Sequence, residues 1–178
     1  MPTTDYTNLI WSGFANNLLI VLLSSLIPLS TGILLNFFAS KKATIGKVFG
    51  WVSLPFECIC PLLLLIILYY LLPAERNNAL FIIVIAFSLS FIGYLPARYI
   101  SSYSFIKNIL YNGLGLISTI FKWSFCVGYI AYNDMLKGAQ MTIARTYNPI
   151  YLLIPFIVSL LILTILEIGK RLIKQLMK

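Results

Sequence analysis

Five apolar runs, each about as long as a membrane is thick, constrain this chain more than any other feature of its sequence. A helix of roughly 20 residues crosses the hydrocarbon of a bilayer at about 1.5 Å per residue, so each run is long enough to form a span. The sequence therefore predicts an all-α fold, a polytopic membrane helix bundle of about five transmembrane helices in a single domain. The runs cover residues 14–37, 49–72, 79–98, 105–132 and 148–168 of a chain numbered 1–178.

The composition agrees with a membrane protein. Hydrophobic residues make up 60% of the 178 residues and charged residues only 10%, whereas a soluble domain is about half apolar and a quarter charged. The net charge of +8 does not predict a nucleic-acid partner, because the basic residues stand in short groups at the ends of the apolar runs. We expect the lipid membrane to be a partner of this surface and nucleic acid not to be one.

The basic residues also orient the bundle, because they favour the cytoplasmic side of a membrane. Five spans place the termini on opposite sides, and an outside N-terminus leaves nine basic residues inside against three outside. The inner set is Lys41, Lys42, Lys47, Arg98, Lys107, Lys170, Arg171, Lys174 and Lys178, and the outer set is Arg76, Lys137 and Arg145. We expect the N-terminus outside and the C-terminus in the cytoplasm. Residues 169–178 then form an amphipathic basic tail at the headgroups, or a simple stop-transfer cluster.

Two ionisable residues, Glu57 and Lys122, stand inside apolar runs, where each costs at least about 2.5 kcal/mol. Such residues commonly face a bundle interior or an aqueous path, although a long lysine side chain also reaches the membrane surface. Glu57 lies between Pro55 and Pro61, and this pair of prolines predicts a bent or broken span. Carriers build solute sites at such breaks, and a packing kink is the alternative. We hypothesise that Glu57 and Lys122 pair across the bundle.

The sequence lacks the residues of an enzyme. It contains no histidine, which is the commonest general base and metal ligand. Its three cysteines, Cys58, Cys60 and Cys126, lie in apolar runs without metal-ligand spacing. No phosphate-binding loop and no pair of nucleophile and base is present. We expect no enzymatic activity, no metal site and no cofactor.

The stretch from Lys122 to Tyr147 resembles the permease subunits of ABC importers for polar amino acids, the histidine, glutamate and glutamine type. In that family, a lysine in the penultimate core span leads to an acidic residue outside, an alanine–glutamine pair and a threonine–aromatic pair before the last span. Here the corresponding residues are Lys122, Asp134, Ala139–Gln140 and Thr146–Tyr147. Weaker similarity upstream extends the resemblance over most of the chain, at Gly13-Phe14, Ser40-Lys41, Glu57 with Pro61, and Gly93-Tyr94-Leu95.

The resemblance implies a permease half of an importer for amino acids or similar small polar solutes. Such a subunit works by alternating access in the inner (plasma) membrane of a bacterium. The resemblance implies a second permease subunit, in a homo- or heterodimer, a cytoplasmic ATPase subunit and an external solute-binding protein as partners. The candidate residues of the solute path are Glu57, Lys122 and Trp123, with Asp134 and Gln140 at its outer mouth.

Two departures from the family pattern keep an alternative open. Trp123 stands where the family has an acidic residue. Only the six residues Tyr99–Ser104 are available for the cytoplasmic loop whose short helix docks on the ATPase. Six residues are too few for that helix and its connections. The alternative is a degenerate permease-like accessory subunit that stabilises or regulates another membrane protein without coupling to ATP.

Overall fold

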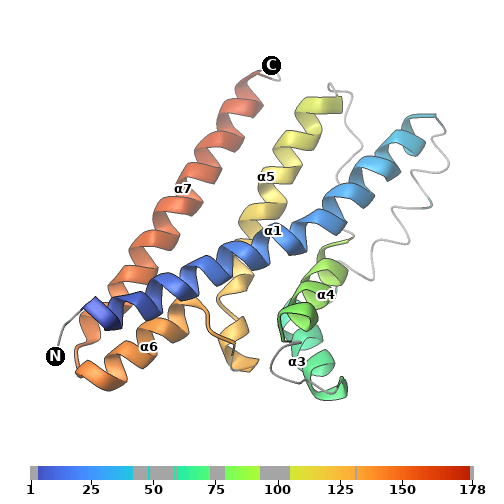
Figure 1. The fold of residues 1–178 in the computed structure, drawn as a ribbon. Coiled ribbons are helices and arrows are strands. Elements are labelled where there is room, and N and C mark those ends of the chain that lie inside the picture. The colour runs from blue at the N-terminus through green and yellow to red at the C-terminus, as the bar shows by residue number, and fades with distance from the viewer. Residues whose placement is uncertain are drawn as a thin grey trace.

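The computed structural model describes residues 4–41, 48, 58, 60–72, 79–92, 105–130 and 132–176, and this part of the chain is helical without strands. Helices α5 and α7 lie side by side, α1 crosses them obliquely, and α3 and α4 pack together at the other end of the layer (Figure 1). The prediction of an all-α helix bundle is thereby confirmed. The elements are α1 (Thr4–Lys41), α3 (Pro61–Leu71), α4 (Ala79–Phe91), α5 (Phe105–Ser124), η3 (Val127–Ile130), α6 (Met135–Thr146), η4 (Pro149–Leu152) and α7 (Leu153–Leu176).

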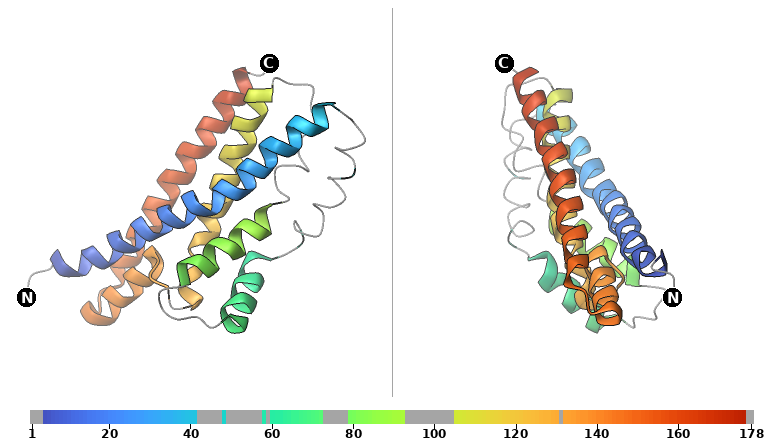
Figure 2. Two further views of the ribbon diagram at one scale, coloured as in Figure 1. Left: turned by 45° about the vertical axis from the view of Figure 1, so that its right-hand side comes forward. Right: turned by 90° about the vertical axis from the view of Figure 1, so that its left-hand side faces the viewer.

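Helix α1 is 38 residues long, which at 1.5 Å per residue is about 57 Å and so exceeds the roughly 30 Å of membrane hydrocarbon. It begins at Thr4, well before the predicted start at residue 14, and it continues through Pro28. Its first turns pack on α6 and its later turns on α4 and α5. The described parts of the chain therefore meet along one long helix, which the views of Figure 2 show crossing on one side of α5 and α7.

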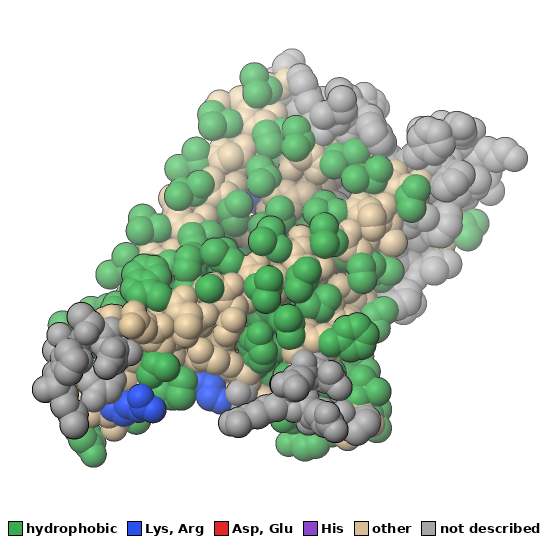
Figure 3. Space-filling view, in the orientation of Figure 1, with side chains coloured by type: hydrophobic (Ala, Val, Ile, Leu, Met, Phe, Trp, Pro, Cys, Tyr) green, Lys and Arg blue, Asp and Glu red, His purple; other side chains and the backbone are tan. Residues whose placement is uncertain are grey.

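Among the described residues, two stretches, Thr7–Leu34 and Pro149–Leu176, are long and apolar enough to cross a membrane, and α3 and α4 are shorter apolar helices. Hydrophobic side chains are spread over the whole described part of the face drawn in Figure 3, and the clearest patches of Lys and Arg lie at its lower edge, near α6. A water-soluble monomer rarely exposes so much continuous apolar surface. Both features favour association with a membrane.

The main apolar core lies where α1, α3, α4, α5 and η3 meet. Phe87 of α4 and Phe121 of α5 are its largest fully buried side chains. Helix α7 contributes little to this core, because Pro155 is the residue of α7 that is buried. The bundle therefore has a packed part around α1 and an open part along α7.

Three sequence-based boundaries differ from the observed ones. The run 105–132 is not one helix, because α5 ends at Ser124 and a turn leads into η3. The polar connection after Tyr132 contains a complete helix, α6. Helix α7 continues unbroken past the predicted end of the last run at residue 168 to Leu176, and the position of the basic tail at the headgroups stays a prediction.

Proline sets the start of α3. Pro61 occupies its first turn, where a missing backbone N–H breaks no helical hydrogen bond, and Cys60 before it is extended. This agrees with a span that is broken at Pro61. The other residues on which that prediction rests, Pro55 and Glu57, lie outside the described residues, as does the Tyr99–Ser104 connection.

Candidate functional site

Asp134 is fully buried and joins η3 to α6. It is the N-cap residue of α6, and its Oδ1 accepts the backbone N–H of Lys137 at 2.6 Å. Its Oδ2 accepts the backbone N–H of Gly128 at 2.8 Å. Each carboxylate oxygen thus has a backbone partner from a different element. The carboxylate ties the end of η3 to the start of α6.

Burial dominates the electrostatics of this carboxylate. Desolvation raises the pKa of Asp134 above its ordinary value of 3.8. The backbone N–H groups of Lys137, Gly128 and Leu136, and the positive charge of Lys137, act in the opposite direction without cancelling it. The proton on Asp134 is therefore held more tightly in the folded protein than in the unfolded chain.

Two glycines allow α1 to approach α6 at backbone distance. A Cβ on Gly13 would collide with the backbone carbonyl of Asp134, and a Cβ on Gly138 would lie 2.5 Å from the carbonyl oxygen of Leu9. Real Cβ atoms do not come this close to backbone. Small residues at both positions are therefore a requirement of this contact. The first turns of α1, the turn at Asp134 and α6 form one packed unit, which we call the α1–α6 junction.

Side-chain hydrogen bonds strengthen the α1–α6 junction. Asn16 of α1 donates from Nδ2 to the backbone carbonyl of Asn133 at 2.8 Å. Asn133 in turn donates from Nδ2 to the hydroxyl of Ser12 at 3.2 Å. These bonds cross from the beginning of the chain to its last third, so they fix α6 on the first helix.

The adjacent residues Lys122 and Trp123 differ in their exposure to solvent. Lys122 lies in the last turn of α5 and is exposed, whereas Trp123 is half-buried and packs against the main apolar core. Trp123 is thus held by packing. The ammonium of Lys122 is available to solvent or to a partner.

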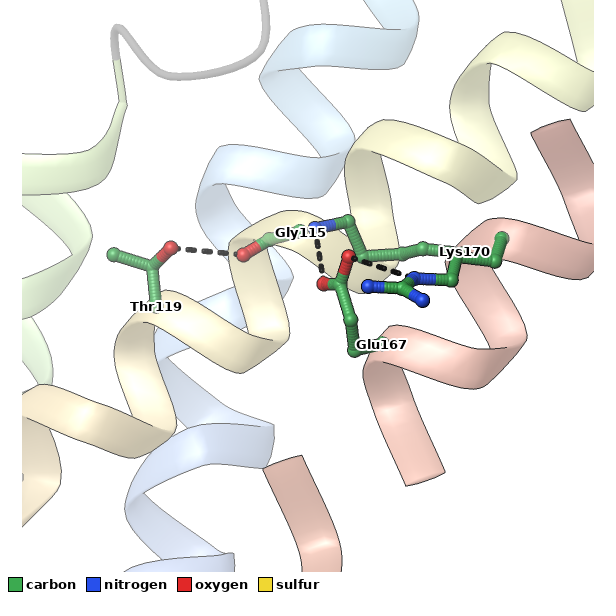
Figure 4. A network of polar contacts seen from close by, with 5 residues as sticks. Gly115, Thr119, Glu167 and Lys170 are labelled. Carbon is green, nitrogen blue, oxygen red and sulfur yellow. Dashed lines mark hydrogen bonds and ion pairs between the residues drawn. The ribbon is translucent and has the colours of Figure 1, made fainter. Parts of the chain in front are cut away.

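Charged side chains line the contact between α5 and α7 (Figure 4). Lys170 of α7 forms an ion pair with Glu167 at 2.8 Å, and Arg171 approaches the other oxygen of Glu167 at 3.9 Å. The ammonium of Lys170 also stands 5.8 Å from the ring centre of Tyr111 on α5. Lys122 is near enough for its charge to act on the Glu167 carboxylate. From the sequence, Glu167 was not singled out and its contacts with Lys170 and Arg171 were not predicted.

The described residues that were predicted to line a solute path differ in burial. Asp134 is buried in the α1–α6 junction, whereas Gln140 is exposed on α6 and Lys122 on α5. Glu57 lies outside the described residues, so its proposed pairing with Lys122 stays a prediction. In the part of the chain that the structure describes, no three His, Cys, Asp or Glu side chains come together as a metal site.

Comparison with known proteins finds no similar protein: no family model, no curated protein and no solved structure matches the chain.

Proposed function

We propose that this chain is the permease subunit of an ABC-type importer for amino acids or similar small polar solutes. The observation that carries the proposal is that some of the residues that resemble the family are buried and hold the fold, whereas others are exposed. Asp134 and Ala139 are buried in the α1–α6 junction, and Tyr147 ends α6 with a left-handed φ of 54°. These residues account for the folding of the outer segment. Lys122 and Gln140 are exposed and are not needed for it.

The exposure of Lys122 favours a role in transport. An ammonium facing lipid within a span is costly, so a charged side chain at this depth turns to water or to another protein chain. In the single chain Lys122 has no ion pair among the described contacts, since the ion pairs of Glu167 are with Lys170 and Arg171. We assign Lys122 to the aqueous path between two permease subunits, with Trp123 behind it and Gln140 nearer the outside.

The proposed topology has five spans, with the N-terminus outside and the C-terminus in the cytoplasm. It is supported by the nine basic residues against three in the sequence. It is also supported by the placement of the start of α1 and the end of α7 at opposite ends of the bundle (Figure 1). The α1–α6 junction then lies on the outer side, and the Glu167–Lys170 pair lies near the inner headgroups.

The alternative function is an accessory subunit that stabilises or regulates another membrane protein without coupling to ATP. The short connection Tyr99–Ser104 favours it, because six residues leave little chain for a helix that docks on an ATPase. The nearly unburied α7 is equally available to a permease partner and to an unrelated membrane subunit.

Isolation of the native complex tests both functions. The chain is extracted from its host membrane in mild detergent, and the accompanying subunits are identified and counted. A stoichiometric ATPase whose hydrolysis is stimulated by a polar amino acid supports the importer. A membrane partner without any ATPase supports the accessory subunit and contradicts the importer.

A further inference from the structure

Asn17 of α1 is fully buried, and neither atom of its side-chain amide has a hydrogen-bond partner. The next residue in the chain behaves differently, since the amide of Asn16 donates to the carbonyl of Asn133 at 2.8 Å. Leaving a buried polar group unpaired costs about 1–3 kcal/mol per group. The amide of Asn17 therefore destabilises the folded chain, and no described hydrogen bond offsets this cost.

Asn17 lies between two turns of α1 that are packed in different ways. One turn before it, Gly13 touches the backbone of Asp134 in the α1–α6 junction. One turn after it, Ile20 and Val21 belong to the main apolar core with residues of α4 and α5. Asn17 thus stands at the boundary between the outer junction and the centre of the bundle.

A second unpaired polar atom lies on the same face of α1. The hydroxyl of Ser24 is buried without a partner, although the backbone carbonyl of Ser24 accepts from Ser88 of α4 at 3.3 Å. Residues seven apart on a helix lie on one face at about 10.5 Å. Asn17 and Ser24 therefore form a line of unsatisfied hydrogen-bonding groups that runs inward from the junction.

We propose that Asn17 is a solute-binding residue of the transport path and that it selects a solute without net charge. The inference rests on the proposed importer function. An amide offers an acceptor to an ammonium or amide N–H group and two donors to a carboxylate or carbonyl oxygen. A zwitterionic amino acid with a neutral side chain supplies both kinds of partner. Asn17 is fully buried in this structure, and its unpaired amide is satisfied when this face of α1 opens and the solute enters.

The charges near Asn17 support a neutral solute. The buried carboxylate in the described part of the chain is that of Asp134, and both of its oxygens already accept backbone N–H groups. Lys122, which we assign to the aqueous path, is exposed, and the exposed carboxylate of Glu167 is paired with Lys170 at 2.8 Å. No buried charge among the described residues is free to compensate a cationic or anionic side chain on the solute.

The test is a substitution whose effects on stability and on binding have opposite signs. Asn17→Leu replaces the amide by an apolar group of similar size, so the melting temperature should rise, because two unpaired polar atoms leave the core. Binding of radiolabelled L-glutamine to the complex with its co-purifying subunits, in lipid nanodiscs, should weaken at least about tenfold, the effect of losing roughly 1.4 kcal/mol. The matched control is Asn16→Leu, which should lower the melting temperature because it breaks a formed hydrogen bond.

Ser24→Ala provides a second variant of nearly unchanged shape. It should leave the melting temperature the same or higher and weaken L-glutamine binding by a smaller factor, about two- to fivefold, below the value of one full hydrogen bond. Competition with L-arginine tests the solute class, and arginine should displace glutamine poorly.

Each result decides the inference. A lower melting temperature for Asn17→Leu would show that the amide is engaged in packing, and unchanged glutamine binding would show that it does not contact the solute. Either result overturns the role of Asn17 and leaves the importer standing. Preferential binding of L-arginine overturns the neutral solute class. If the wild-type complex binds neither amino acid, the importer function and the role of Asn17 fall together.

Discussion

Gly13 of α1 lies directly against the backbone of Asp134, so that the first helix of the chain touches the turn before α6 without any side chain between them. The contact joins segments from opposite ends of the sequence. It is followed one turn further out by Gly138 of α6 against the carbonyl of Leu9. Both glycines are placed where a methyl group has no room.

The first prediction concerns this contact. Gly13→Ala should destabilise the protein by about 1–3 kcal/mol, because the added methyl group meets rigid backbone and forces α1 and α6 apart. The measurement is thermal or denaturant unfolding of the detergent-solubilised protein. Gly169→Ala is the control, since a Cβ there meets the end of the Leu114 side chain at 3.4 Å, an ordinary contact. Equal stabilities for the two variants would contradict the close approach.

A second prediction follows from the buried cap. Because burial raises the pKa of Asp134, protonation of this carboxylate is more favourable in the folded protein than in the unfolded chain. The stabilising effect of this protonation is fully present below the ordinary pKa of 3.8 and is lost as the pH rises through the raised pKa. The difference in unfolding free energy between wild type and Asp134→Asn should therefore fall with rising pH over that window and then stay constant.

Unfolding of both proteins across acidic pH checks this sign. A difference that increases with pH would mean that the backbone N–H groups outweigh burial at Asp134. Asp134→Asn should in addition cost about 1–3 kcal/mol at neutral pH, because the amide NH2 group that replaces one carboxylate oxygen is a donor and cannot accept the backbone N–H that this oxygen accepted.

Lys122 gives the third prediction. Lys122→Ala should change the stability by less than about 0.5 kcal/mol, since the side chain is exposed and makes no structural bond in the described part of the chain. Solute-stimulated ATP hydrolysis by the complex should nevertheless fall about 10- to 100-fold, the effect of one lost charge-assisted hydrogen bond. The control is Lys174→Ala, which removes an exposed lysine of α7 and should retain activity. Full activity of Lys122→Ala would remove Lys122 from the solute path.

Tyr147 gives the fourth prediction. Its φ of 54° places a bulky residue in the left-handed region at the C-terminus of α6, at a cost of about 1–2 kcal/mol. Tyr147→Gly should therefore stabilise the protein by up to about 1 kcal/mol, after the entropy cost of glycine. Tyr129→Gly, in η3 without a positive φ, should destabilise it. Both differences are read from melting temperatures. A less stable Tyr147→Gly would show that the exposed ring contributes more than the strained backbone costs.

The sequence was sufficient to predict the helix bundle, because runs of apolar residues longer than about 18 leave few other folds. It was also sufficient in principle for α6, which we read as a polar connection. Asp134 before Met135 is a typical N-cap, and the apolar or small residues Gly138, Ala139 and Thr142 recur on one helical face. The helical spacing of these residues was not recognised, because the segment of α6 is short and carries Lys137 and Arg145.

The glycine contacts and the hydrogen bonds of the asparagine amides could not be predicted from the sequence. A glycine in a span is a common packing residue, so the sequence does not distinguish Gly13, which touches backbone, from Gly169, which has room beside it. Asn16 and Asn17 are identical in type and adjacent in sequence, yet one amide is bonded and the other is not. The path role of Asp134, Gln140 and Trp123 stays a prediction, and burial separates Asp134 from the two exposed candidates Lys122 and Gln140.

The contact between Gly13 and Asp134 also has a consequence for the order of events during synthesis. At about 5–20 residues per second, the ribosome completes the first helix several seconds before it delivers the segment against which that helix finally rests. In the interval the outer turns of α1 remain without their partner. The first turns of α1 therefore reach their final packing only after α6 has been synthesised.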